Sequence, residues 1–221
     1  MSLEYHRREL TIALDPSNRA RAMPLVLPAK HRRILDVGCG MGQTLLAAQL
    51  PGEVEAYGID RDLEAIEAGS RLAPANIKLV CANGENIPFQ NGYFDLVISR
   101  IAIPYMDINK ALREIARVLR VGGEFWLTLH PVSKVFSRAK HSALGGDLSD
   151  VLVCSYVLLN GTLFHCFGIQ IPVLRRKETF QTASGIARAA KRAGLACSPV
   201  RPSTHFIMEG LKPFPESERA A

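Results

Sequence analysis

Residues 34–43, with the sequence ILDVGCGMGQ, contain the pattern that decides the fold. Residues 34–37 are typical of the end of a buried strand, and residues 43–48 are typical of a helix. Glycine in the turn between them permits positive φ and a close approach of a ligand to the backbone, although such a turn can also be a purely structural connection. The three glycines of this turn occupy every second position: Gly38, Gly40 and Gly42.

The turn differs from a dinucleotide-binding fingerprint. The pattern G-x-G-x-x-G, counted from Gly38, requires a third glycine where the chain has Gln43, which argues against NAD. Asp60 ends the second predicted strand, residues 54–59, about 20 residues beyond the glycine turn. An acidic side chain there can accept hydrogen bonds from both ribose hydroxyls of an adenosine ligand, and the alternative is an exposed aspartate in a turn.

Strand and helix patterns alternate from residue 34 to residue 129. This alternation predicts an α/β fold with a doubly wound, mainly parallel sheet and helices on both faces. Ligands of such sheets bind beyond the carboxyl ends of the strands, so we expect the site there. The further predicted strands are 77–81, 94–99 and 125–129, and the predicted helices begin near residue 62 and span 109–120, the latter ending at Gly122-Gly123.

The remaining segments do not follow this alternation. A short helix from Ser17 or Asn18 to about Leu27 is predicted within an N-terminal lid, residues 1–30. Asn160-Gly161 lies between two apolar runs, which predicts an added β-hairpin after strand five, over the carboxyl edge of the sheet. The hairpin strands are expected at 151–158 and 162–169, and a closing helix capped by Ser184 precedes strands at 195–200 and 205–211.

Three motifs resemble those of one enzyme family. Asp36 and the three glycines match the first motif of the class I S-adenosylmethionine-dependent methyltransferases, (D/E)-x-G-x-G-x-G, position for position. Residues 83–89, NGENIPF, are similar to the family's D-A-E-x-L-P-F, with Asn83 in place of aspartate, and residues 94–97 match F-D-x-V. Residues 119–123, LRVGG, are similar to L-(K/R)-P-G-G. The resemblance covers about residues 30–130 and is to the small-molecule group of methyltransferase type 11, which includes ubiquinone and menaquinone biosynthesis enzymes.

The resemblance implies a Rossmann-like sheet of seven strands that binds S-adenosyl-L-methionine, gives S-adenosyl-L-homocysteine and needs no metal ion. Asp60 would bind the ribose, Arg61 would flank the adenine, and the Asn83 side-chain oxygen would accept from the adenine amino group. The expected cofactor-binding residues are Asp36, Gly38, Cys39, Gly40, Gly42, Asp60, Arg61, Asn83, Gly84, Glu85 and Ser99.

The acceptor side of the site is expected beyond strands four and five. His130 directly follows strand five and is the candidate general base, because an imidazole can take a proton near neutral pH; the alternative is a histidine bonded to backbone before Pro131. No N/D-P-P-Y/F motif follows strand four, which argues against the adenine and glutamine N-methyltransferases that carry it. The candidate substrate residues are Arg100, Tyr105, Tyr156 and His165.

Composition limits the remaining possibilities. The 221 residues suggest a single methyltransferase domain, 1–221, with a cofactor-binding core at 31–130, a substrate-region insertion at 131–180, and a closing segment at 181–221. No apolar run of ~20 residues and no signal peptide is recognised, so we expect a cytoplasmic protein without a membrane span. The five cysteines are odd in number and widely spaced, which argues against disulfides or zinc.

The net charge of +6 permits binding to nucleic acid, although the basic residues are dispersed. We therefore expect a small-molecule methyl acceptor, with O- or C-methylation favoured. The open alternatives are an RNA methyltransferase of the same fold, a protein that binds S-adenosylmethionine without catalysis, and an NAD(P) dehydrogenase.

Overall fold

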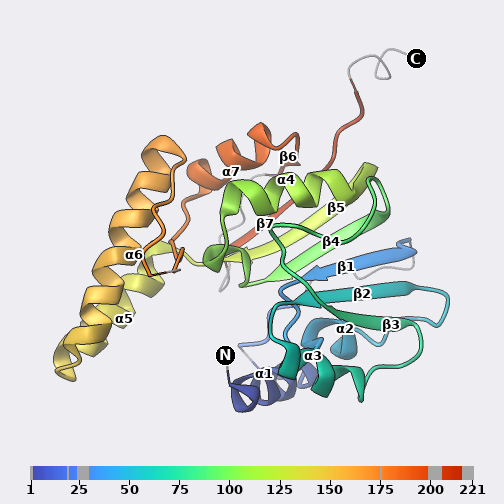
Figure 1. The fold of residues 1–221 in the computed structure, drawn as a ribbon, viewed down its shortest axis with the longest axis horizontal. Coiled ribbons are helices and arrows are strands. Elements are labelled where there is room, and N and C mark those ends of the chain that lie inside the picture. The colour runs from blue at the N-terminus through green and yellow to red at the C-terminus, as the bar shows by residue number, and fades with distance from the viewer. Residues whose placement is uncertain (1, 19, 24–29, 175, 199–205, 216–221) are drawn as a thin grey trace.

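The computed structural model describes residues 2–18, 20–23, 30–174, 176–198 and 206–215. One sheet of seven strands forms its centre, in the order β3-β2-β1-β4-β5-β7-β6 (Figure 1). The pairs along β3-β2-β1-β4-β5 are parallel, whereas β7 is antiparallel to β5 and β6. The predicted doubly wound, mainly parallel sheet is confirmed. The strands are β1 (Arg33–Val37), β2 (Glu55–Asp60), β3 (Ile77–Cys81), β4 (Phe94–Arg100), β5 (Leu119–Leu129), β6 (Ala196–Cys197) and β7 (Phe206–Leu211).

Helices cover both faces of this sheet (Figure 1). One face packs against apolar residues of α4 and α7, including Leu112 and Ile186, and the other packs against Leu45 of α2. Burial of such side chains stabilises the fold by ~1.5–3 kcal/mol each. The helices are α1 (Leu3–Leu14), α2 (Gln43–Ala47), α3 (Leu63–Ser70), α4 (Ile108–Val118), α5 (Val132–Leu144), α6 (Leu148–Phe167) and α7 (Ala183–Arg192), with a 3-10 turn, η1, at Ile103–Tyr105.

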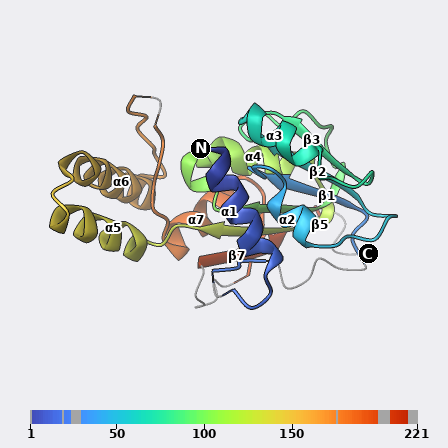
Figure 2. The same cartoon turned by 90° about the horizontal axis from the view of Figure 1, so that it is seen from below.

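The segment after β5 differs from the sequence prediction, because α5 and α6 replace the expected β-hairpin. Asn160 and Gly161 lie inside α6, where both are buried. The Asn160 side chain accepts from the Ile171 backbone N–H at 2.7 Å, and a Cβ at residue 161 would overlap the Phe180 ring. These two residues therefore serve helix packing and not a turn. Figure 2 shows α5 and α6 side by side, projecting from the sheet as an arm.

The N-terminal helix also lies elsewhere than predicted. Ser2 caps α1 by accepting from the Tyr5 backbone N–H at 3.3 Å, so the helix starts well before Ser17. The Asp15 side chain accepts from the Ser17 backbone N–H at 2.9 Å in a turn, which ends the helix. The predicted helix at 17–27 is wrong for the described part of that range, and residues 24–27 lie outside the described residues.

Two smaller boundaries are also corrected. Helix α4 ends at Val118, because the chain enters β5 at Leu119, and the Gly122-Gly123 pair lies within that strand. Thr182, not Ser184, caps α7 by accepting from the Gly185 backbone N–H at 3.1 Å.

Helix α6 also corrects the expectation that no segment is long and apolar enough to cross a membrane. It has 20 residues, and its mean hydropathy over 18 residues is 1.4. Its length and composition therefore meet the criterion for a span, which buried helices of soluble proteins also meet.

Candidate functional site

The glycine turn between β1 and α2 has the backbone that its sequence predicts. Gly38, Gly40 and Gly42 have φ of +75°, +57° and +80°, in the left-handed region that other residues rarely adopt. Glycine is also required by close approach, since a Cβ at Gly38 would overlap the Ala102 side chain. Ile101, just before Ala102, has φ +61°, an unfavourable conformation for a β-branched residue that costs ~1–3 kcal/mol. Strain at the end of β4 thus accompanies the approach of Ala102 to the turn.

Asp36 is the last residue but one of β1, and its side chain is fully buried. Neither carboxylate oxygen meets a partner with hydrogen-bond geometry in the described part of the chain. Burial raises the pKa of Asp36 to about 7; the nearby Arg100 guanidinium opposes this, the Asp60 charge adds to it, and the Thr44 hydroxyl opposes it. A buried carboxyl group without a partner is costly, and it is suited to accept from a cationic ligand.

A cavity of about 390 Å³ opens at the carboxyl ends of the first four strands. Its size suits a nucleoside-sized ligand. It brings together seven residues that the sequence predicted for the site: Gly38, Asp60, Arg61, Asn83, Gly84, Glu85 and Tyr105. It also includes Ala82 and Ala102, which lie just after predicted strands, and three residues that the sequence did not single out, namely Ile59, Met106 and Lys177.

Asp60 is held at the rim of the glycine turn. Its carboxylate accepts from the Gly40 backbone N–H at 2.8 Å and from the Asp62 backbone N–H at 3.0 Å. A carboxylate has about four acceptor positions, so capacity remains for two ribose hydroxyls.

The Asn83 side-chain oxygen accepts from the Glu85 backbone N–H at 3.0 Å, which leaves its amide N–H groups available. The Glu85 carboxylate pairs with the Lys177 ammonium at 2.7 Å and accepts from the Asp107 backbone N–H at 3.0 Å. Burial raises the pKa of Glu85, but these hydrogen bonds outweigh it and hold the pKa below its usual value. Glu85 therefore fixes one wall of the cavity, and Lys177 comes from the segment after α6.

Other predicted residues lie outside the cavity lining and support the turn. Cys39 is buried with its Sγ 3.5 Å from the Gly40 carbonyl oxygen. The Ser99 hydroxyl donates to the Val37 carbonyl oxygen at 2.7 Å, so it ties β4 to β1. Gly40 and Gly42 also do not line the cavity, and a Cβ at Gly40 would lie 2.5 Å from His6 Nδ1.

Helix α1 packs against the turn through residues that no motif marked, and a lid role for this segment stays a prediction. His6 is buried, and its Nδ1 lies 3.2 Å from the Gln43 side-chain nitrogen. Glu9 pairs with Arg100 at 3.2 Å, and both side chains are largely buried. The candidate substrate residue Arg100 is therefore already partnered by α1.

His130 and Tyr105 lie together beyond β5. Their ring centroids are 5.4 Å apart in an edge-to-face arrangement. Burial, with the Lys134 and Arg138 charges, lowers the pKa of His130 to about 4, so the ring is neutral at pH 7 but a weak base. Its backbone N–H and carbonyl both bond to Gln181, at 3.0 and 2.8 Å. Burial, followed by the Glu178 and Tyr5 charges, raises the pKa of Tyr105 to about 12.

The structure does not bring the other two candidate substrate residues to the cavity. Tyr156 contacts the carbonyl oxygens of Ile171 and Arg176, at 2.9 and 2.7 Å. His165 Nδ1 lies 2.7 Å from the Thr182 hydroxyl, which joins α6 to α7. Both were expected on a ribbon over the sheet, and the helical arm orients them toward structural partners.

Comparison with known proteins finds similarity to methyltransferases. Residues 35–127 match the family model described as "Methyltransferase domain". The chain is 37% identical over 107 residues to the uncharacterized methyltransferase YcgJ of Bacillus subtilis, covering 46% of this chain and 42% of that protein. It is 34% identical over 128 residues to the ubiquinone/menaquinone biosynthesis C-methyltransferase UbiE of Geotalea daltonii, covering 54% of each. The chain thus spans about half the length of these relatives.

The solved structure of the Bacillus subtilis YcgJ protein has the same fold. It superposes with a TM-score of 0.57 at 18% identity, covering 95% of this chain and all of that one. The Rossmann-like fold of the class I methyltransferases is therefore the fold of this protein.

Proposed function

We propose that the chain is an S-adenosyl-L-methionine-dependent methyltransferase whose acceptor is a small molecule. The observation that carries this proposal is the cavity between the glycine turn, Asp60 and Asn83, because it places a left-handed turn beside a ribose acceptor. The methyltransferase relatives support it. O- or C-methylation stays the favoured prediction, and the C-methyltransferase named among the relatives is in line with it. A single domain over 1–221 and a cytoplasmic location also stay predictions.

The residues present fit the methyl donor. Asp60 would hold the ribose hydroxyls, and Asn83, with Arg61 beside it, would face the adenine. Asp36 would accept from the ammonium group of the amino-acid part, since its buried carboxyl group has no partner among the described residues.

The donor, when bound, supplies a sulfonium methyl group that is already electrophilic. The protein must then mainly orient the acceptor and exclude water, an effect of proximity. Tyr105 lines the cavity and stays protonated, so it can donate a hydrogen bond to the acceptor. His130 beside it is neutral at pH 7 and is proposed to take a proton where the acceptor loses one.

Calorimetry with S-adenosylhomocysteine tests the cofactor site. We expect binding in the micromolar range, ~7–9 kcal/mol, and a loss of roughly 1–3 kcal/mol in Asp60→Ala, because the ribose loses a charged acceptor. Glu67→Ala, at an exposed position of α3, is the matched control and should bind as the wild type does. Circular dichroism must show that the Asp60→Ala variant is folded. If its dissociation constant for S-adenosylhomocysteine then equals that of the wild type, Asp60 does not belong to the site.

An RNA methyltransferase is the second candidate, favoured by the net charge of +6. RNA binding that weakens steeply with salt would support it, because phosphate contacts release counterions. Binding of S-adenosylhomocysteine without methyl transfer to a broad acceptor panel would instead support a non-catalytic binding protein.

A further inference from the structure

The arm formed by α5 and α6 carries an apolar outer face that the proposed function does not use. Only 28% of the apolar window of α6 is buried inside the protein, although its mean hydropathy is 1.4. The arm projects from the body of the protein, as two views show (Figures 1 and 2). An exposed apolar surface of this kind marks an interaction site.

The outer face of α6 carries three exposed leucines, with the uncharged residues Ser155 and Thr162 beside them. Leu148, Leu152 and Leu159 are 75%, 71% and 62% exposed, and their spacing places them on one side of the helix. The opposite side holds the buried residues Cys154 and Val157. The sequence has no Asp, Glu, Lys or Arg from Val151 to Phe167, so this outer face lacks the charges usual on a solvated helix.

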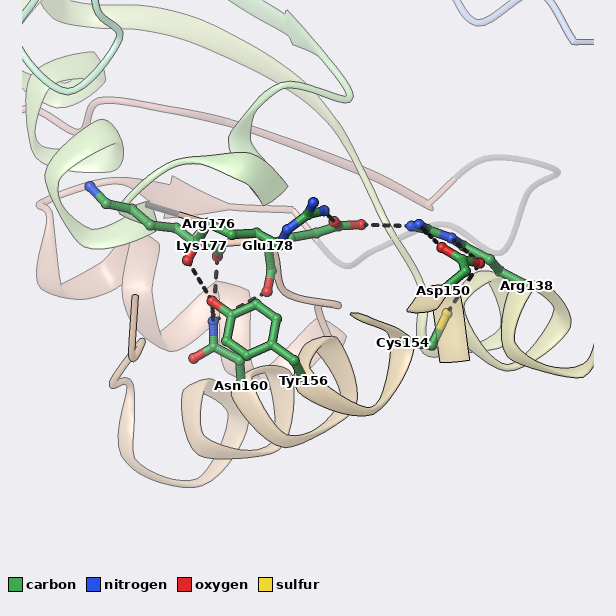
Figure 3. Close-up of polar contacts among 8 residues, drawn as sticks. All are labelled: Arg138, Asp150, Cys154, Tyr156, Asn160, Arg176, Lys177 and Glu178. Carbon is green, nitrogen blue, oxygen red and sulfur yellow. Dashed lines mark hydrogen bonds and ion pairs between the residues drawn. The ribbon is translucent and has the colours of Figure 1, made fainter. Parts of the chain in front are cut away.

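A loop beside α6 adds a protruding apolar tip. Leu174 is 97% exposed and Val173 is 45% exposed. Tyr156 and Asn160 of α6 hold this loop by hydrogen bonds to the backbone on both sides of the tip. Both side chains bond to Ile171. Both also bond to backbone carbonyl oxygens of residues 176–178 (Figure 3). The tip is therefore presented by a hydrogen-bonded support.

The arm and its loop carry more basic than acidic residues. Residues 132–178 contain six Lys and Arg, two Asp and one Glu, an excess of three positive charges. Glu178 pairs with Arg138 and Arg176, and Asp150 pairs with Arg138 (Figure 3). Lys177 pairs with Glu85 at the wall of the cavity. Apolar residues on an interfacial helix together with basic residues favour an anionic lipid surface.

We propose that the outer face of α6 and the tip of the loop dock onto the surface of a bilayer that contains anionic lipids. The charge excess disfavours a second copy of the chain as the occupant, since a symmetric pairing would bring the two positive arms together. The contact between His165 and Thr182 joins α6 to α7, and hence to the body of the protein. The helix therefore lies on the membrane and does not cross it. This docking needs no methyl transfer.

Sedimentation with vesicles tests the proposal in the full chain. Vesicles of phosphatidylcholine with phosphatidylglycerol should bind the wild type at least tenfold more strongly than vesicles of phosphatidylcholine alone, and salt should weaken the binding. The affinity of the double variant Leu152→Glu/Leu159→Glu for the anionic vesicles should fall by about tenfold or more, because the variant places two anionic groups on the docking face. Leu72→Glu is the matched control, since Leu72 is 57% exposed in the turn after α3, away from the arm, and this variant should bind as the wild type does.

Leu174→Trp gives an independent readout. The chain's one native tryptophan, Trp126, is buried on β5, so a new exposed tryptophan dominates the response to lipid. Its fluorescence should shift to the blue when the anionic vesicles are added. The proposal would be overturned if the wild type sediments with neither kind of vesicle. It would also be overturned if Leu72→Glu loses as much vesicle binding as the double variant. A dimer that dissociates in the double variant would assign the face to a second copy.

Discussion

Burial makes the stability of the folded chain depend on pH through Asp36, a proposed cofactor-binding residue. Its pKa is about 7 in the folded chain and near its ordinary value, ~3.9, in the unfolded chain, so the folded state binds the proton more tightly. The stabilisation is fully present below about pH 4 and is lost as pH rises through 7. We expect the free energy of unfolding of the ligand-free protein to fall by a few kcal/mol over this range, and Asp36→Asn to remove the slope, as measured by urea unfolding.

Asp36 also predicts that ligand binding is coupled to the release of a proton. If Asp36 accepts from the ligand's ammonium group, S-adenosylhomocysteine should bind with release of a proton below pH 7, which calorimetry in buffers of different ionisation enthalpy detects. Adenosine lacks the ammonium group and is the control. Equal weakening of both ligands by Asp36→Asn would place the carboxyl group away from the amino-acid part.

The pKa of His130 is shifted downward, in contrast to the upward shift at Asp36. Burial, then the Lys134 and Arg138 charges, lowers its pKa to about 4, so a base role requires only that pH stay above this value. Once an acceptor is known, His130→Ala should slow single-turnover methyl transfer by ~100-fold, and His130→Asn should be nearly as slow. The wild-type rate should be level from about pH 5 to neutrality as far as this group is concerned. Rates within a few-fold of wild type in both variants would leave His130 a positioning residue.

At the scale of single elements, α6 depends on a helical glycine that packs against an aromatic ring. A Cβ at Gly161 would overlap the Phe180 ring, so Gly161→Ala should lower the free energy of unfolding by ~1–3 kcal/mol even though alanine favours helices by about 1 kcal/mol. Phe180→Leu in the same chain should restore part of the loss, because it removes ring atoms at the point of overlap. Denaturant unfolding of both variants measures this. If Gly161→Ala instead raises the free energy of unfolding, the Phe180 ring moves aside without an energetic cost.

The same element explains where sequence reasoning failed. An apolar run of this length with Asn160-Gly161 in its middle fits a hairpin by local pattern, whereas the contacts with Ile171 and Phe180 favour the helix. Those contacts join segments about 10 to 20 residues apart, and the periodicity of the hydrophobic residues does not report them. The strands and helices of the core followed from local periodicity, because each one buries a face that its own sequence marks.

Across the whole molecule, the arrangement of the proposed cofactor-binding residues was more predictable than that of the proposed acceptor-binding residues. Gly38, Asp60 and Asn83 meet at the cavity because parallel strands end at one edge of the sheet. Lys177 reaches the same cavity from the segment beyond α6, and Glu9 reaches Arg100 from α1. Neither position follows from strand order, since both depend on how the arm and α1 pack against the core.

A ligand that occupies this cavity should stabilise the whole chain. S-adenosylhomocysteine at one hundred times its Kd adds about 2.7 kcal/mol to the free energy of unfolding. For a chain of this size that increment raises Tm by roughly 5–10 °C. At the same concentration Asp60→Ala should show a clearly smaller rise, and NADH should give none, because the glycine spacing does not suit a dinucleotide. If NADH raises Tm as much as S-adenosylhomocysteine does, the cavity recognises only the adenosine part of its ligand. Among the proposed contacts, only Asp36 would then distinguish the methyl donor from a dinucleotide.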